Sequence, residues 1–355
     1  MRVVVLGATG NVGIAVVRAL AAADQVEEVV GVARRLPDLD VPGTRWESAD
    51  VTRDDLVGHL QGAQAVVHLA WQIQPSRDPR ATWRTNVEGT VRVLEAVASA
   101  GVRSFVYASS VGAYSPGPKG DAVDESWPTH GIPTSNYSRE KAYVERLLDT
   151  FTLEHPEVRV VRLRPGLIFQ DEAASEVRRF FLGSLFPNRL ADARLLPVVP
   201  NVSDVRFQAV HTADVAEAYR LALVGDAHGA FNVAAEPVLD LPTVARLLDA
   251  RAFTVPRAVV RPAAALTWWL RLHPVEPGWV DLALHAPVMD VSRARAELGW
   301  VARRGADEAV TELLAGIAAG RGAPTPTLEP DRERSRTGEL ATGQGARYDR
   351  PEGVG

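Results

Sequence analysis

The sequence predicts an α/β fold in which a doubly wound parallel sheet is covered by helices on both faces and carries a smaller C-terminal lobe. Short, continuously apolar runs alternate with helical stretches in the first half of the chain. A glycine-rich turn joins the first apolar run to the first helix, and the pattern changes after residue 165. Strands that are apolar throughout, each followed by a helix, are typical of parallel sheets buried on both faces.

The apolar runs and the helical spacing define the expected elements. Strands are expected at 3–6, 29–32, 65–69, 105–108 and 158–163, and helices at 11–22, 53–60, 81–100 and 137–155. Gly62 and Gly101 follow two of these helices, where a C-terminal cap glycine belongs. Val87, Val91 and Leu94 recur at helical spacing, so the third helix is expected to pack on the sheet.

The turn behind the first strand has the pattern of a dinucleotide-binding loop. Three glycines at spacing G-x-x-G-x-x-G occupy the stretch Gly7, Ala8, Thr9, Gly10, Asn11, Val12, Gly13. The first glycine permits the tight turn, the second lets backbone approach the pyrophosphate, and the third lets helix and strand pack closely. The helix N-terminus then faces the anion. A glycine triplet alone also fits a structural turn without a ligand.

The end of the second strand predicts which nucleotide binds. A carboxylate there accepts the ribose hydroxyls of NAD, whereas an arginine pairs with the 2′-phosphate of NADP. Ala33 is followed by Arg34 and Arg35. We therefore predict NADP, with NAD as the alternative. The two arginines also fit a solvated charge pair at a strand end that binds no nucleotide.

The domain boundaries follow from the change of pattern after residue 165. We expect a dinucleotide-binding domain over 1–168, to which late strands at about 205–235 return. Residues 169–204 and 236–320 are expected to form the substrate lobe, with Trp268 and Trp269 in its core. The run Arg178, Arg179, Phe180 and Phe181 is expected to line a substrate mouth or to belong to an amphipathic helix of the lobe. Residues 322–355 have almost no apolar periodicity, which predicts a disordered tail.

Composition excludes several classes of function. The chain has 355 residues, of which 46% are hydrophobic and 23% charged, with a formal net charge of −5. That charge provides no basic stripe for nucleic acid. Because there are no cysteines, a disulfide framework, a thiolate zinc site and a cysteine nucleophile are excluded, and we expect no metal. No apolar run approaches 18 residues, so we expect a cytoplasmic protein without a membrane partner; the sequence leaves a homodimer open.

A tyrosine and a lysine open the helix after the fourth apolar run. Tyr137 and Lys141 stand at i and i+4, so both side chains can reach one site. A neighbouring ammonium lowers a tyrosine pKa that starts near about 10, and such a tyrosine exchanges a proton while a nicotinamide exchanges the hydride. Ser109 and Ser110 end the preceding strand, where a hydroxyl can donate a hydrogen bond to the same substrate oxygen. Each pattern alone also occurs for purely structural reasons.

Taken together, these motifs resemble the extended branch of the short-chain dehydrogenase/reductases, the NAD-dependent epimerase/dehydratase-type proteins, over roughly residues 1–320. This implies a Rossmann-type fold. The resemblance rests on the glycine loop, Asp50-Val51, His68-Leu69-Ala70, Asn86-Val87-x-Gly89-Thr90, Ser109-Ser110, Tyr137-x-x-x-Lys141, Arg164-Pro165-Gly166 and His211-x-x-Asp214-Val215.

The resemblance implies a role for each matching residue. Tyr137 would be the acid/base, Lys141 would bind the nicotinamide ribose and lower the tyrosine pKa, and Ser110 would polarise the substrate oxygen. Asp50 would hold the adenine. The remaining expected cofactor contacts are Gly7, Thr9, Gly10, Asn11, Val12, Gly13, Arg34, Arg35, Val51, Leu69, Ala70, Asn86 and Pro165.

Three departures from the family pattern shape the expected function. Val111 and Gly112 stand where dehydratases carry an acidic pair, Phe207 stands where sugar-nucleotide enzymes often present an arginine, and Ala33-Arg34 replaces the NAD-selecting acid. We therefore expect an NADP(H)-dependent oxidoreductase that interconverts a secondary alcohol and a ketone on a small, partly apolar molecule. The alternatives are an NAD(P)-dependent epimerase/dehydratase on a sugar or sugar nucleotide, and a non-catalytic NADP-sensing regulator. The substrate and the direction stay open, because the pocket comes from the variable lobe.

Overall fold

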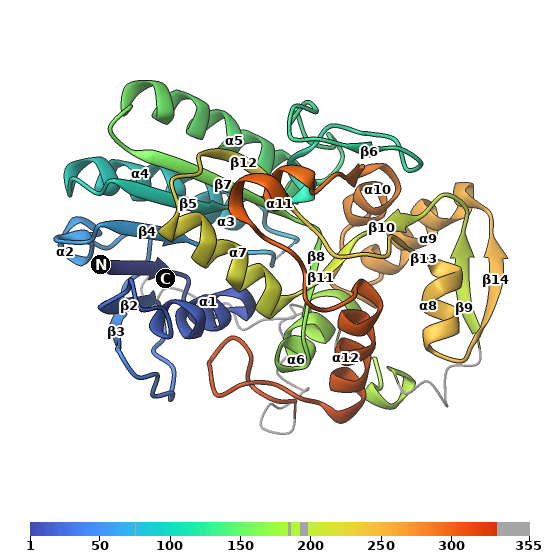
Figure 1. Cartoon of the computed structure of the whole chain (residues 1–355). Coiled ribbons are helices and arrows are strands. Elements are labelled where there is room, and N and C mark those ends of the chain that lie inside the picture. Colours follow the sequence, from blue (N-terminus) through green and yellow to red (C-terminus); the bar gives the residue numbers. More distant parts are fainter. Residues whose placement is uncertain (75, 184–185, 192–197, 332–355) are drawn as a thin grey trace.

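A seven-stranded parallel sheet forms the centre of the molecule, as the sequence predicts (Figure 1). The computed structural model describes residues 1–331 apart from 75, 184–185 and 192–197. The strand order is β12-β7-β5-β4-β1-β2-β3, and every neighbouring pair is parallel. The strands are β1 (Arg2–Leu6), β2 (Glu28–Ala33), β3 (Thr44–Ser48), β4 (Ala65–His68), β5 (Ser104–Ala108), β7 (Arg159–Pro165) and β12 (Gly229–Val233).

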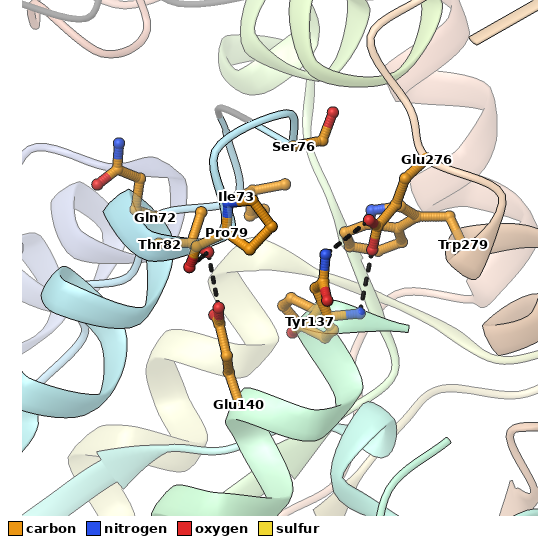
Figure 2. Close-up of a pocket in the computed structure, with 10 residues that line it drawn as sticks. Gln72, Ile73, Ser76, Pro79, Thr82, Tyr137, Glu140, Glu276 and Trp279 are labelled. Carbon is orange, nitrogen blue, oxygen red and sulfur yellow. Dashed lines mark hydrogen bonds between the residues drawn. The ribbon is translucent and has the colours of Figure 1, made fainter. Parts of the chain in front are cut away.

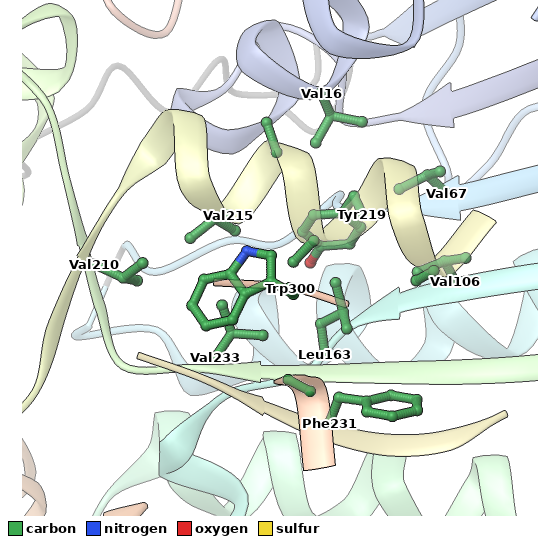
Figure 3. Close-up of a cluster of buried hydrophobic side chains, with 14 of the residues drawn as sticks. Val16, Val67, Val106, Leu163, Val210, Val215, Tyr219, Phe231, Val233 and Trp300 are labelled. Carbon is green, nitrogen blue, oxygen red and sulfur yellow. The ribbon is translucent and has the colours of Figure 1, made fainter. Parts of the chain in front are cut away.

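Apolar side chains on both faces of each strand make two cores. Val3 and Val5 of β1 belong to one core and Val4 and Leu6 to the other, because successive side chains of a strand point to opposite faces. Helices α1 (Asn11–Ala21), α7 (Thr212–Val224) and α11 (Ser292–Leu298) cover the first face, where Trp300 is also buried (Figure 3). Helices α2 (Val57–Leu60), α4 (Gly89–Ser99) and α5 (Asn136–Glu154) cover the second.

Two features of this domain differ from the expected elements. Strand β3 was not predicted, because it lies at the edge of the sheet and its residues are half-buried or exposed rather than continuously apolar. The helix expected at 81–100 is divided into α3 (Pro79–Trp83), a π-helical turn over Arg84–Glu88 and α4. Such π-turns occur frequently at functional sites, and this one contains Asn86.

The lobe is built from short strand pairs and helices rather than from one sheet. The pairs join β9 (Val198–Val202) to β14 (Arg251–Val255), β10 (Arg206–Phe207) to β13 (Leu239–Asp240), β8 (Leu167–Phe169) to β11 (Ala209–His211) and β6 (Ala122–Val123) to β15 (Val288–Met289). Its helices are α6 (Ala174–Val177), α8 (Leu241–Leu247), α9 (Arg257–Trp269), α10 (Gly278–His285) and α12 (Ala306–Ala319). Of the late strands, β12 lies in the main sheet, whereas β10 and β11 do not. In the part of the chain that the structure describes, no helix combines the length and apolar character of a membrane span.

The expectation for the tryptophan pair of the lobe is wrong. Helix α9 buries none of its residues, and Trp269 is 71% exposed. Trp268 is partly covered because the guanidinium of Arg77 lies 4.3 Å from the centroid of its ring. The apolar residues of α9 are therefore half-buried or exposed and do not form a buried core of the lobe.

A buried ion pair ties helix α5 to the sheet. The carboxylate of Glu145 is fully buried and accepts hydrogen bonds from Arg164 Nε at 2.9 Å, Arg162 Nη1 at 2.9 Å and Ser109 Oγ at 2.6 Å. Arg164 Nη1 also donates to the Tyr114 hydroxyl at 3.0 Å. Burial alone would raise the pKa of Glu145, but Arg164 and Arg162 lower it to about 2. The pair is thus a charged, fully hydrogen-bonded connection through the core.

The segment after α12 packs back onto the molecule, so the prediction of disorder from residue 322 is wrong for residues 322–331. Leu328 and Ala323 are buried together with Ala173. Thr325 Oγ1 donates to the carbonyl oxygen of Thr9 at 2.9 Å, directly on the glycine-rich loop. The buried guanidinium of Arg178 pairs with Asp331 at 2.8 Å. A few buried side chains and hydrogen bonds therefore hold this segment in place although its sequence has no apolar periodicity. Residues 332–355 lie outside the part of the chain that the structure describes.

Leu328→Ala tests whether this segment is part of the fold. Removing a fully buried leucine leaves a cavity, so we expect the free energy of unfolding in urea to fall by about 2–5 kcal/mol. Leu153→Ala is the matched control, because Leu153 is 83% exposed, and it should change stability by about 0.5 kcal/mol or less. Equal effects of the two variants would show that the segment does not contribute to the fold.

Glu145→Gln tests the buried ion pair. It leaves Arg164 buried without its counter-ion, which costs about 3–5 kcal/mol. Because the pKa of Glu145 lies below its ordinary value of 4.5, its stabilisation is complete above pH 4.5 and is lost as the pH falls towards 2. The variant should therefore show a smaller loss of stability over that range. Glu95→Gln, at an exposed site of α4, should behave as the unmodified protein in urea titrations at pH 7 and pH 3.

Candidate active site

The glycine-rich loop shapes a backbone cradle at the carboxyl end of β1. Gly7 has φ +83°, and a Cβ there would lie 2.6 Å from the backbone nitrogen of Ala70. A Cβ on Gly13 would lie 2.3 Å from the carbonyl oxygen of Gly7. At Gly10 the nearest described heavy atom would be 3.7 Å away. Gly7 and Gly13 are therefore needed for packing, whereas Gly10 leaves open space beside the N-terminus of α1.

This open space fits the pyrophosphate of a dinucleotide. Gly10 is the N-cap residue of α1 and supplies no side-chain cap to the first-turn amides. Those amides and the helix dipole suit an anion. The Asn11 side chain points elsewhere, since its Oδ1 accepts from Gln170 at 2.9 Å and from Thr212 at 3.0 Å. Asn11 thus ties the loop to the lobe and to α7.

The residues expected to hold the adenosine end lie along the ends of β2 and β3. Arg34 and Arg35 are exposed and directly follow β2. Asp50 follows β3, and its Oδ1 already accepts from Thr52 N at 2.9 Å and Thr52 Oγ1 at 2.8 Å. Val51 is buried and contacts Gly89, where an added Cβ would lie 2.9 Å from Val51 Cγ2.

Ser110, Tyr137 and Lys141 meet at the carboxyl end of β5. Ser110 Oγ accepts from the Gly112 amide at 3.0 Å. It lies beside the Tyr137 ring, since a Cβ on Gly112 would be 3.4 Å from Ser110 Oγ and 2.8 Å from Tyr137 Cε1. Lys141 Nζ lies 5.8 Å from the centroid of the Tyr137 ring and donates to the Ala108 carbonyl oxygen at 2.7 Å. The three residues that the sequence predicted therefore lie around one point.

Three other expected cofactor contacts lie at the ends of neighbouring strands. Leu69 and Ala70, after β4, are partly buried beside Gly7, and Pro165, which is buried, ends β7.

The titration of the tyrosine differs from the expectation. Burial raises the pKa of Tyr137 to about 12, although the hydrogen bond with Ser110 acts in the opposite direction and lowers it. Burial also lowers the pKa of Lys141 well below its ordinary value. The ammonium lies 3.4 Å over the ring of Trp71, so it is directed at the indole and at Ala108 rather than at the phenol oxygen. In this arrangement Tyr137 is a proton donor.

Asn86 supports the site through the protein rather than facing open space. Its amide nitrogen donates to Glu140 Oε2 at 2.6 Å and to the Gln72 carbonyl oxygen at 2.8 Å, and its Oδ1 accepts from the Gln72 amide at 2.6 Å. Glu140 also accepts from Thr82 Oγ1 at 2.6 Å. The π-helical turn thus fixes both the loop after β4 and the carboxylate next to Lys141.

A small cavity adjoins Tyr137, and part of its wall is formed by Glu276 and Trp279, which the sequence did not identify. It is lined by Gln72, Ile73, Ser76, Pro79, Thr82, Asn136, Tyr137, Glu140, Glu276 and Trp279 (Figure 2). The centroids of the Trp279 and Tyr137 rings are 4.8 Å apart. Glu276 accepts hydrogen bonds from the Asn136 backbone at 3.0 Å and side chain at 2.8 Å. Burial raises the pKa of both Glu140 and Glu276.

Arg178 and Arg179 do not line this opening. Both are 1% exposed. Arg178 pairs with Asp331, and Arg179 Nη1 donates to the Glu329 carbonyl oxygen at 3.2 Å. Phe181, two residues after Arg179, does reach the site. The centroid of its ring is 5.0 Å from that of the Trp279 ring.

Comparisons with known proteins identify related sequences. The model of the NAD dependent epimerase/dehydratase family matches residues 3–234. The chain is 30% identical over 158 residues to an NAD-dependent glucose-6-phosphate dehydrogenase of Haloferax volcanii, covering 41% of this chain and 59% of that protein. It is 28% identical over 121 residues to a UDP-glucose 4-epimerase of Mus musculus, covering 32% and 34%. Matches to the first curated relatives span about a third to three fifths of their lengths.

The fold also has solved counterparts. The UDP-glucose 4-epimerase of Thermus thermophilus, determined in complex with NAD, superposes with a TM-score of 0.65 at 23% identity. The superposition covers 89% of this chain and 99% of that one. This similarity establishes a shared architecture.

Proposed function

The chain belongs to the NAD dependent epimerase/dehydratase family, and we propose that it acts at a secondary hydroxyl of a sugar-like substrate through Ser110, Tyr137 and Lys141. It is an NAD(P)-dependent enzyme of the extended short-chain dehydrogenase type. The observation that carries the proposal is the convergence of these three side chains beside a cavity lined by hydroxyl-binding groups. When bound, the nicotinamide cofactor supplies the hydride acceptor or donor. Two relatives, a UDP-glucose 4-epimerase and an NAD-dependent glucose-6-phosphate dehydrogenase, are sugar-linked enzymes by name, which supports a sugar-like substrate.

The protein's own groups handle the proton. Tyr137 is protonated at neutral pH, since its pKa is about 12, and in this form it donates to the oxygen of a carbonyl, which leaves a phenolate. The phenolate takes a proton from an alcohol, so a reaction that starts from the alcohol requires Tyr137 to lose its own proton first. Ser110 donates to the same oxygen and steadies its developing charge. The Lys141 amino group, held by Ala108 and Trp71, is a donor for the ribose of the cofactor.

Between the candidate reactions, similarity favours epimerisation over our first expectation of net alcohol–ketone conversion. An epimerase returns the hydride to the same substrate, so the cofactor stays bound. Net oxidoreduction is the second candidate, and it is favoured by Arg34 and Arg35 at the end of β2, which suit an exchangeable NADP. An intact Ser–Tyr–Lys set weighs against a regulator without catalytic activity, because a sensor needs no proton donor beside the nicotinamide.

Tyr137→Phe tests the catalytic proposal. The variant keeps the ring but removes the proton donor, so turnover should fall about 10²–10⁴-fold while nucleotide binding and stability are kept. Ser110→Ala should lower turnover with little effect on cofactor affinity, whereas Lys141→Met should lower both. A panel of sugars, sugar nucleotides and ketones, screened with NADP(H) and NAD(H) by nicotinamide absorbance and product analysis, supplies the substrate. Unchanged turnover in Tyr137→Phe would refute the mechanism.

Arg34→Asp tests the choice of cofactor. We expect NADPH to bind more tightly than NADH, because a guanidinium pairs with the 2′-phosphate. Loss of that charge-assisted contact costs about 1.5–3 kcal/mol, or roughly ten- to hundredfold in the ratio of dissociation constants. Arg103→Asp, at an exposed position before β5 and at the opposite end of the strands, should leave the ratio unchanged. Equal or tighter NADH binding by the unmodified chain in calorimetry would contradict the assignment.

A further inference from the structure

A second cavity lies behind the aromatic wall of the site and is largely apolar. Its volume is about 480 Å³, and its lining residues are Phe181, Leu182, Ala264, His273, Val275, Glu276, Trp279, Val280 and Ala283. This volume lies within the range of small-molecule sites. Helices α9 and α10 and the segment after α6 supply the apolar walls.

The two cavities share a boundary. Trp279 and Glu276 line both of them. Figure 2 shows these two side chains on the lobe side of the small cavity, facing Tyr137. One neighbour of the Trp279 ring is Tyr137, and another is Phe181, which belongs to the apolar cavity. The Tyr137 site and the apolar cavity are therefore neighbours, with the Trp279 ring and the Glu276 side chain at their common boundary.

We infer that the substrate is amphipathic, with a hydroxylated head beside Tyr137 and an apolar tail in the cavity between α9 and α10. This inference rests on the proposed function and names its substrate class. The head would meet acceptors and donors on Glu140, Glu276 and Asn136, whereas the tail would meet mainly carbon atoms.

The charge at the boundary disfavours a nucleoside diphosphate as the tail. The described residues that line the second cavity include no lysine or arginine, and the carboxylate of Glu276 lies where the tail would pass. A diphosphate at this point would be desolvated beside a like charge without a cation to balance it. An alkyl or aryl group brings no second negative charge to this point and gains free energy from burial.

Calorimetric titration of the full chain, saturated with its preferred nucleotide, tests the inference with butyl, hexyl and octyl β-D-glucosides below their micelle-forming concentrations. Each added methylene that enters the cavity should lower Kd by about fourfold. Ala264→Phe fills the cavity from α9 and should raise Kd for the octyl compound at least tenfold, with less than a twofold change for the butyl compound.

Ala263→Phe is the matched control, because Ala263 is the exposed neighbour of Ala264 on the same helix. It should keep the dependence on chain length. If Ala264→Phe does not fold, Ala283→Phe places a ring in the same cavity from α10 and should act alike. A Kd independent of chain length, or equal effects of Ala263→Phe and Ala264→Phe, would overturn the inference; the second result would assign the binding to exposed residues such as Leu266 and Trp269.

The same measurements separate this inference from the proposed function. Tyr137→Phe should leave the dependence of Kd on chain length intact, because the phenol oxygen does not contact the tail. If Tyr137→Phe keeps full turnover while chain-length dependence persists, the catalytic mechanism fails and the apolar cavity stands. If Tyr137→Phe loses turnover and chain length has no effect, the mechanism stands and the tail is refuted.

Discussion

The buried carboxylate of Glu145 determines how the catalytic helix sits on the sheet. Tyr137, Lys141 and Glu145 are spaced four residues apart on α5, so they form one stripe along the same face. Arg164 holds the inner end of that stripe, and Ser109 Oγ, next to Ser110, donates to the same carboxylate. One buried charge thus fixes both the helix that carries Tyr137 and the strand exit that carries Ser110. A helix held only by apolar contacts would tolerate small rotations that move both groups.

The nucleotide-binding half could be read from the sequence because its physics is local. Continuous apolar strands, a glycine loop between strand and helix, and a tyrosine and lysine one turn apart are all short-range patterns. The structure confirms the parallel sheet and brings Ser110, Tyr137 and Lys141 together. The edge strand β3 escaped prediction because exposure on one side removes the apolar run on which the prediction depends.

The substrate side could not be read in this way, because its parts come from distant segments. Glu276 and Trp279 stand in the lobe about 140 residues after Tyr137, and no local pattern marks them. The pKa of Tyr137 also depends on burial and on its hydrogen bond with Ser110, which spacing alone does not specify. Family similarity has the same limit: the shared sheet accounts for the cofactor, whereas the lobe, which varies between relatives, closes the small cavity and lines the apolar one.

The contact between Thr325 and Thr9 also has a consequence for the order of events during protein synthesis. The two residues are 316 positions apart. At elongation rates of about 5–20 residues per second, the glycine-rich loop waits roughly 15–60 s for the segment that packs on it. During this time the loop and the first strands exist without this contact. A ligand that binds early would then stabilise the nascent domain by mass action, so the cofactor would assist the folding of the chain before it takes part in catalysis.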